Sequence, residues 1–378
     1  MIPQLSHKPR HAVVMSQLLM RIRLVCPLWN AVAISTPSLW VHLVIQPHCP
    51  LPPHILSIWL ERSKTYHLCI GLDLTDEEES CPTSQILSVL GPSVPRWEIL
   101  RLYVRANPAH LICDYLPLSR AIRLKSLYLN IASYRTPHTF FAHLGTIPNL
   151  KSFEFCPADE HTCGLVARYM KPTLSNLSHL CFEGEWEHPW KILQFFQNSG
   201  TILNLRWTYC PRFVPSITFS NLKVLHLYVS MDFAICLLSS FHLPALQLLD
   251  LDLECVPRHG FPEPGRFSNH FSVFEYSLQV LRISELRNAD GLERLFQMPI
   301  INAIPLVEVI VDSCEWERTC KKDWSSVCGR TVRVELGTDH GYDEIFVGWN
   351  DLFSFPLLFI DYLSSDHVRP LHEWNYQK

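Results

Sequence analysis

Glycine is scarce in this chain, with 13 residues among 378. Loops that cradle phosphate groups and the sharp turns that expose a catalytic serine both depend on glycine, and neither a Walker-type loop nor a G-x-S-x-G turn occurs in the sequence. The H-E-x-x-H pattern of zinc hydrolases is missing as well. We therefore expect a protein that is not an enzyme and that needs no cofactor.

Long apolar runs are also missing. The longest late run covers residues 352–360, far short of the roughly 20 residues that a membrane-spanning helix requires. An earlier apolar segment at 12–20 is followed by Arg21 and Arg23, where the cleavage site of a secretory signal would need small residues. We expect a soluble protein of the cytoplasm or nucleus with no membrane partner.

Acidic residues do not occur before Glu61, whereas Lys8, Arg10, Arg21 and Arg23 precede it. The first sixty residues thus carry +4 and the remainder −8, which gives the net charge of −4. This balance offers no basis for nucleic-acid binding. Two interpretations explain the positive amino-terminal end equally well: surface charge that is simply uneven, or a patch that attracts acidic partners.

The 14 cysteines include no C-x-x-C pair. Two loose groups have some likeness to zinc ligands: Cys156, His161 and Cys163, and Cys314, Cys320 and Cys328. Neither group has paired spacing or a clear fourth ligand. Many cysteines lie in apolar strand-like runs, where they act as small buried hydrophobes in a reducing compartment. We expect no metal site.

An internal repeat organises most of the chain. An apolar residue recurs at positions 1, 4 and 6 of the unit L-x-x-L-x-L, and nine copies begin at Trp97, Leu124, Leu150, Leu177, Ile202, Leu222, Leu246, Leu278 and Leu306. Each copy alternates like a strand, and segments with helical spacing, such as those from Ser84 and Trp190, lie between copies. Stacked units bury both apolar faces, so we predict an α/β solenoid with a curved parallel sheet and helices on its convex side.

The repeat resembles the leucine-rich-repeat family over about residues 97–314. That family usually places Asn or Cys three positions after the last apolar residue of the template, and here only Cys210 and Cys314 do so. We therefore expect irregular turns, to which the 28 prolines also point. We predict a solenoid over residues 97–336 and a carboxy-terminal cap over 337–378 that closes its apolar end.

The amino-terminal segment 24–40 reads LVCPLWNAVAISTPSLW. Its apolar residues form one helical stripe: Val25, Leu28, Trp29 and Val32. A helical hairpin that caps the solenoid would satisfy this pattern. The order of residues also resembles the second half of the F-box in the version common in mushroom-forming fungi, with a Val-Cys pair, a Trp three residues after the Cys, and a Thr-Pro-x-Leu-Trp ending.

In that family the module docks on the Skp adaptor of cullin-RING ubiquitin ligases. The resemblance implies a docking face formed by Leu24, Val25, Cys26, Trp29, Pro37, Leu39 and Trp40. The family's first helix, Leu-Pro-x-Glu-Ile-Leu, has only faint counterparts in residues 1–20, which predicts a truncated module over 1–48. A linker helix and first strand over 49–96 would join this module to the solenoid.

Positions 5 and 7 of each unit are polar and face outward on the concave side of such a solenoid. Tyrosine and arginine at these positions favour protein binding, because they combine apolar area with directed polar contacts. The predicted target-binding residues are Arg101, Tyr103, Tyr128, Arg206, His226, Tyr228, Asp250, Asp252 and Arg282. An exposed strand face must, however, be polar in any case. Glu154 and Glu183 lie on the same face, and nothing in the sequence provides a cleft in which they could act as an acid-base pair.

The resulting prediction is a substrate-recruiting subunit of a Skp-cullin-F-box ubiquitin ligase, which would accelerate the reaction by proximity alone. The target protein is not specified by the sequence. The alternative is a repeat scaffold that binds proteins without the adaptor, and an enzyme of another type is a third possibility.

Overall fold

The structure is a computed structural model, and the residues that it describes are 19, 21, 23–45, 52–74, 81–105, 109–133, 136–184, 190–207, 214–229, 234, 237–238, 240–252, 278–284, 308–313 and 332–336. Twelve strands form one sheet whose spatial order follows the chain. They are β1 (His42–Ile45), β2 (Leu68–Leu74), β3 (Trp97–Val104), β4 (Ser126–Ile131), β5 (Ser152–Cys156), β6 (His179–Gly184), β7 (Ile202–Trp207), β9 (Val224–Val229), β11 (Leu248–Asp252), β12 (Val280–Ser284), β13 (Glu308–Ser313) and β14 (Val332–Leu336). All neighbouring strands in this sheet are parallel.

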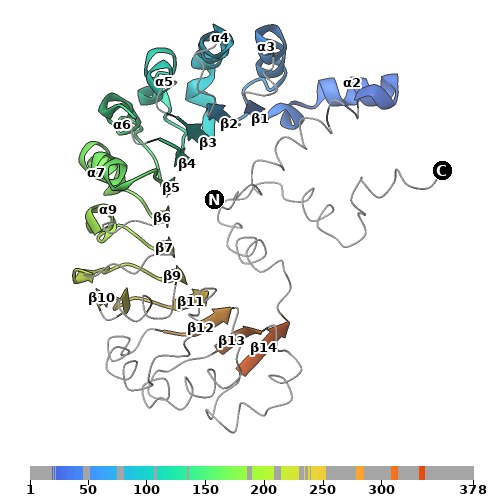
Figure 1. Ribbon diagram of the computed structural model, residues 1–378. Coiled ribbons are helices and arrows are strands. Elements are labelled where there is room, and N and C mark those ends of the chain that lie inside the picture. Colours follow the sequence, from blue (N-terminus) through green and yellow to red (C-terminus); the bar gives the residue numbers. More distant parts are fainter. Residues whose placement is uncertain are drawn as a thin grey trace, which may run out of the picture.

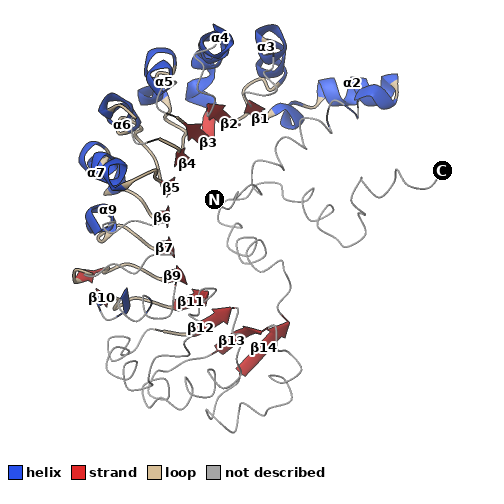
Figure 2. Ribbon diagram, viewed as in Figure 1, coloured by secondary structure: helices blue, strands red, loops and turns tan. Residues whose placement is uncertain are grey.

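Helices cover the outer side of the curved sheet, and the strands line its inner side (Figure 1). The helices are α2 (Pro27–Ser35), α3 (Pro53–Arg62), α4 (Cys81–Leu90), α5 (Ala109–Tyr115), α6 (His138–Leu144), α7 (Glu160–Tyr169), α8 (Lys171–Leu174) and α9 (Trp190–Phe196). Short 3₁₀ helices η1 (Pro37–Trp40), η2 (Gly91–Arg96) and η3 (Leu118–Arg120) also occur. Near β9 and β11 the outer side includes a two-stranded sheet of β8 (Ile217–Thr218) and β10 (Phe241–His242) (Figure 2). The predicted curved parallel sheet with outer helices is confirmed for the described residues.

The strand register extends the repeat beyond the nine predicted copies. Leu43 of β1 pairs with Ile70 of β2, and Ile70 pairs with Leu100 at position 4 of the first predicted unit. At the other end, Val309 of β13 pairs with Val332 of β14. The sheet therefore begins at β1 and runs through the segment 49–96, which was predicted to hold a linker helix and a first strand and contains α3 and β2. The strand β2 was predicted, but not as a repeat unit, and β1 was not predicted; the register places Trp40 and His67 at position 1 of these two units.

One predicted unit has the wrong register. Leu180 pairs with Leu203, so the unit predicted to begin at Ile202 begins two residues earlier, at Gly200. A Cβ on Gly200 would overlap the ring of Phe196, so this ring occupies the space of a side chain at position 1. Because the shift is two residues, the outward face of the strand is unchanged.

Hydrogen bonds continue the sheet beyond the strand ends. The amide groups of Lys151 and Ser152 both donate to the carbonyl of Lys125, at 2.8 and 2.9 Å. Outside the strands, the side-chain amide of Asn149 donates to the carbonyl of Ile122 at 2.7 Å. Such bonds between repeats satisfy backbone groups that irregular turns leave open.

The core lies between the sheet and the outer helices. Side chains at positions 4 and 6, such as Leu100 and Leu102, are fully buried, and Phe153, Phe155 and Phe182 fill the middle of the solenoid. No helix of the described residues is both long and apolar enough to cross a membrane. The predicted cap over 337–378 lies outside the described residues.

Candidate binding surfaces

Helix α2 is attached to the first repeat through Trp40. The indole N–H of Trp40 donates to the carbonyl of Ala33 at 2.7 Å. The ring packs edge-on against Trp59 of α3, with centroids 4.9 Å apart, and the Arg62 guanidinium lies 4.5 Å from the ring centroid. Trp40 also occupies position 1 of the first repeat unit, so one residue joins α2 to the solenoid core.

The prediction that Trp40 belongs to the docking face is therefore corrected. Its side chain is only 1% exposed, because it fills the end of the repeat core. Pro37, at the start of η1, is half-buried. Both residues position α2.

The other predicted docking residues lie on a largely exposed surface. Ala33 is the only residue of α2 that is buried, whereas the large apolar side chains of this region are exposed. The exposed fractions are 84% for Leu24, 62% for Val25, 69% for Leu28, 51% for Trp29, 53% for Val32 and 37% for Leu39. Cys26 is half-buried between the helical residues 23–25 and α2.

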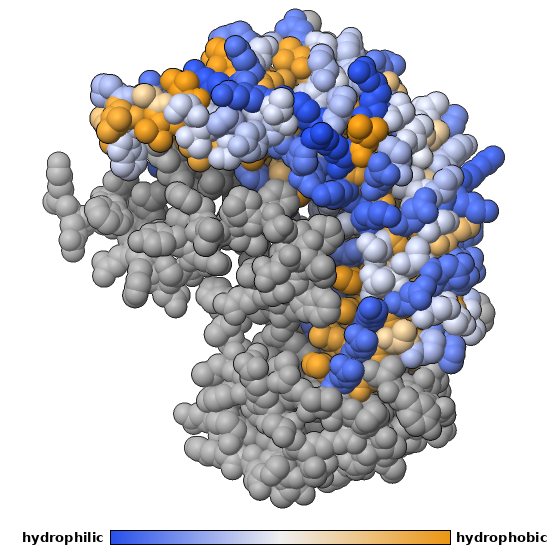
Figure 3. All heavy atoms as spheres, turned by 180° about the vertical axis from the view of Figure 1, so that it is seen from behind, coloured by the Kyte–Doolittle hydropathy of each residue, from blue (hydrophilic) through white to orange (hydrophobic). Residues whose placement is uncertain are grey.

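We call the surface formed by the six exposed apolar residues the α2 apolar face: Leu24, Val25, Leu28, Trp29, Val32 and Leu39. Figure 3 shows apolar side chains gathered at this end of the molecule. Large exposed apolar patches on a soluble protein often mark sites of interaction with other proteins. Leu28 and Val32 were absent from the predicted docking set, although their helical spacing placed them on the same stripe as Val25 and Trp29.

On the concave face, the structure brings two predicted target-binding tyrosines together. The rings of Tyr103 on β3 and Tyr128 on β4 lie 5.0 Å apart, and Asn130 Nδ2 donates to Tyr128 Oη at 3.4 Å. Burial raises the pKa of both tyrosines. Arg101 lies beside them and is half-buried, so this end of the face offers two neutral phenols and one cation.

Farther along the concave face, Arg206 contacts one acidic and one aromatic neighbour. Its guanidinium lies 3.4 Å from the Glu183 carboxylate and 4.3 Å from the centre of the Tyr228 ring. The register places Glu183 beside Arg206 and Arg206 beside Tyr228. Glu183 therefore has a cationic partner, and Glu154 pairs in register with Cys181, so the two acids do not form a matched pair.

The next group on the concave face contains residues that the sequence did not identify. Asn204 Nδ2 lies 3.3 Å from His179 Nε2, and Ser152 Oγ lies 3.3 Å from His179 Nδ1. If Nε2 accepts from Asn204, Nδ1 carries the proton and donates to Ser152. The predicted register of β7 set Asn204 directly beside His179, whereas in the structure Asn204 pairs with Cys181 and reaches His179 diagonally.

His226 and Asp250 continue this group. His226 Nδ1 lies 2.9 Å from Asp250 Oδ2. Asp250 is 7% exposed, which is less than expected for an outward strand residue. Asp252 and Arg282 occupy the predicted outward positions on β11 and β12, and their side chains lie outside the described residues.

An ionic cluster lies at the edge of the sheet where the strands β2, β3 and β4 begin. Glu98 accepts from Lys125 Nζ at 2.7 Å and pairs with His67 Nδ1 at 3.2 Å. Burial opposes the charge of Glu98, but the hydrogen bonds and charges of Lys125 and then His67 outweigh it and lower the pKa of Glu98. This cluster joins three successive repeats.

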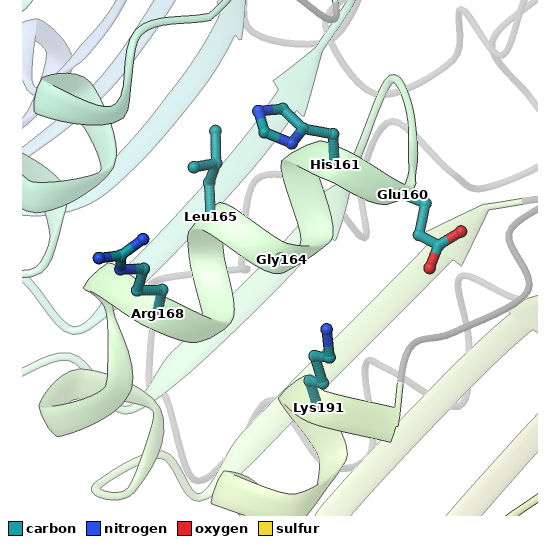
Figure 4. Close-up of a pocket in the computed structure, with 6 residues that line it drawn as sticks. All are labelled: Glu160, His161, Gly164, Leu165, Arg168 and Lys191. Atoms are coloured by element: carbon teal, nitrogen blue, oxygen red, sulfur yellow. The ribbon is translucent and has the colours of Figure 1, made fainter.

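The outer face has an open hollow of about 370 Å³ between α7 and α9, lined by Glu160, His161, Gly164, Leu165, Arg168 and Lys191. In Figure 4, Lys191 extends from α9 toward α7, whereas His161 and Leu165 extend away from α9. The charged groups do not converge on one point. A Cβ on Gly164 would meet no atom within 4 Å, so no neighbour accounts for this glycine inside a helix.

No group of three or more metal-binding side chains occurs within the described ranges. Burial raises the pKa of the Cys156 thiol to about 12, and Cys163 is 2% exposed. A buried thiol with a raised pKa is a poor metal ligand, because the thiolate is the binding form. The second loose group, at 314, 320 and 328, lies outside the described residues.

No family model matches this chain, and no curated protein matches it. The structure itself defines a class: a curved α/β repeat protein with helices outside and a continuous parallel sheet inside. Its candidate sites are two surfaces, the α2 apolar face and the concave strand face.

Proposed function

We propose that this chain is the substrate-recruiting subunit of a ubiquitin ligase, in which the α2 apolar face docks on a Skp-type adaptor and the concave face holds a target protein. The observation that carries the proposal is the exposure of α2. This helix resembles the F-box in sequence, and of its nine residues only Ala33 is buried. Trp29 is 51% exposed, and tryptophan is enriched among the residues that contribute most of the binding energy at protein interfaces.

The concave face supports the second half of the proposal. It offers half-buried Tyr103, Tyr128 and Tyr228 together with Arg101 and Arg206, the residue types that are enriched where proteins bind one another. The side chains are already ordered by stacking and ion pairs, so binding would cost less conformational entropy. No side chain would take part in bond making, and the chain would raise the rate by holding the target near the ubiquitin-charged enzyme.

Co-purification of the full chain with a recombinant Skp adaptor tests this proposal. The test variant is the double substitution Leu28→Glu, Val32→Glu, which places two carboxylates on side chains that are 69% and 53% exposed. The matched control is Ile122→Glu, because Ile122 is 58% exposed but lies in the connection before β4. Trp40 is unsuitable as a test position, since its replacement would also detach α2.

We expect the intact chain and the Ile122→Glu control to retain the adaptor and the double variant to lose it. Failure of the intact chain to bind any Skp adaptor would contradict the proposal. That outcome would favour the alternative function, a repeat scaffold whose concave face binds proteins without an adaptor.

A further inference from the structure

Within the part of the concave face that the structure describes, two buried acceptor atoms have no hydrogen-bond partner. They are Asn204 Oδ1 on β7 and Asp250 Oδ1 on β11. Buried acceptors are nearly always satisfied, so each exception needs an explanation. Here the two exceptions lie in one row across the sheet, because Asn204 pairs in register with His226 and His226 with Asp250.

The remaining atoms of both side chains are held in place. His226 Nδ1 lies 2.9 Å from Asp250 Oδ2, and Asn204 Nδ2 lies 3.3 Å from His179 Nε2. Each side chain therefore has one end fixed and one oxygen left over. The terminal torsion of an Asp side chain is soft, so a small rotation can present Asp250 Oδ1 to a donor that approaches from the concave side.

The local charge selects the kind of donor. Among the described side chains at positions 5 and 7 of β5 to β11, Glu154, Glu183 and Asp250 are acidic and Arg206 is basic. Arg206 lies 3.4 Å from Glu183. The described residues contain no cluster suited to a metal ion. A positively charged organic group is therefore the donor that fits, and hydrogen bonds between such a group and a carboxylate are the strong kind.

We propose that Asp250 binds a positively charged side chain of the target protein, an arginine or a lysine, while Asn204 Oδ1 accepts a further N–H group from the same segment. This inference rests on the proposed role of the concave face in target binding. It adds the chemistry of recognition: the target segment presents a basic residue over β9 and β11.

The experiment uses the full chain without adaptor and follows the His226 imidazole resonances by NMR, assigned with a His226→Gln variant. The probes are N-acetylarginine methylamide, the corresponding lysine compound and the corresponding citrulline compound, which has the shape of arginine without its charge. The test variant is Asp250→Asn, which keeps the shape of the side chain. Its matched control is Asp73→Asn, on β2 near the other end of the same face.

We expect one or both charged compounds to shift the His226 resonances, and the citrulline compound to do so at least about tenfold more weakly. Asp250→Asn should weaken binding by a similar factor, and Asp73→Asn should leave it unchanged. The relative affinities of the arginine and lysine compounds identify the preferred side chain.

Three outcomes would overturn the proposal: no shift with either charged compound, equal binding of the citrulline compound, or unchanged binding in Asp250→Asn. A fourth concerns Arg282, which follows Asp250 in the same row. Binding that occurs only in an Arg282→Ala variant would mean that the chain's own arginine fills the site. Adaptor co-purification of Asp250→Asn keeps this test separate from the first proposal, because the α2 apolar face is unchanged in that variant.

Discussion

The ends of helices in successive repeats are closely packed. From this packing we predict that replacing glycine by alanine lowers the stability of the fold at Gly145 and raises it at Gly164. Gly145 follows α6, and a Cβ at this position would overlap the backbone carbonyl oxygen of Tyr169, the last residue of α7. Its backbone is an ordinary right-handed helical one, with φ −62° and ψ −13°, so alanine would be strained only by contact. Gly164, inside α7, has no atom within 4 Å of the Cβ position.

The expected magnitudes follow from these surroundings. Gly145→Ala should destabilise the fold by about 1–3 kcal/mol through overpacking, less about 0.4–1 kcal/mol gained because the unfolded chain becomes stiffer. Gly164→Ala should stabilise α7 by about 0.5–1 kcal/mol, because glycine within a helix is unfavourable by that amount relative to alanine. Gly91→Ala is a second test of the expected destabilisation, since a Cβ at this position would lie 2.6 Å from the carbonyl oxygen of Tyr115.

Urea denaturation followed by far-ultraviolet circular dichroism measures both changes. The unfolding midpoint should fall for Gly145→Ala and rise for Gly164→Ala, at similar slopes. Equal shifts in the same direction would refute the reasoning, because both positions would then show only the common effect of replacing glycine, and the close contact between Gly145 and the end of α7 would be wrong.

Two further predictions concern Trp40, which packs before the first strand, and Glu98, at the start of β3. Trp40→Phe should lower the free energy of unfolding by about 1–3 kcal/mol, because it leaves the Ala33 carbonyl without its buried donor, whereas Trp29→Phe should change it by less than about 0.5 kcal/mol; equal losses in urea titrations would contradict the corrected role of Trp40. Glu98→Gln should destabilise the chain at neutral pH and progressively less as the pH falls below about 4.3. The sign follows because the pKa of Glu98 is lowered in the folded state, so its contribution is present above the unfolded pKa and is lost as the folded carboxylate is protonated. A difference between wild type and Glu98→Gln that does not change with pH would rule out this ion cluster as its cause.

The strands were predictable because their signal is local. Alternation of apolar and polar residues needs only about six residues, and it identified the nine units from β3 to β13. The same method did not extend the repeat to β1 and β2, although β2 was predicted as the first strand of the segment 49–96. At β7, Gly200 concealed the register, since the ring of Phe196 supplies from another element the volume that the template expects at position 1.

The surfaces were less predictable, because they depend on contacts between repeats. A tryptophan in a helical hairpin is equally suited to an interface or to a core, and only packing against Trp59 and the bond to Ala33 decides the case of Trp40. Likewise, the bond between Asn204 and His179 joins residues 25 positions apart. The predicted alignment of the units from Leu177 and Ile202 already set these two residues side by side, but the contact between their side chains could be identified only from the structure.

The double role of Trp40 bears on how the two proposed surfaces would work together. Trp40 ends the segment that resembles the F-box and also fills position 1 of the first repeat, so α2 is attached to the sheet without an intervening linker. Eight strand intervals separate β1 from β11 in the sheet order, which places Asp250 about 40 Å along the sheet from the first strand. Under the proposed function, the number of repeats would therefore fix the distance between adaptor and target. The effective concentration of the target at the ligase would then depend on this fixed geometry and not on the length of a flexible tether.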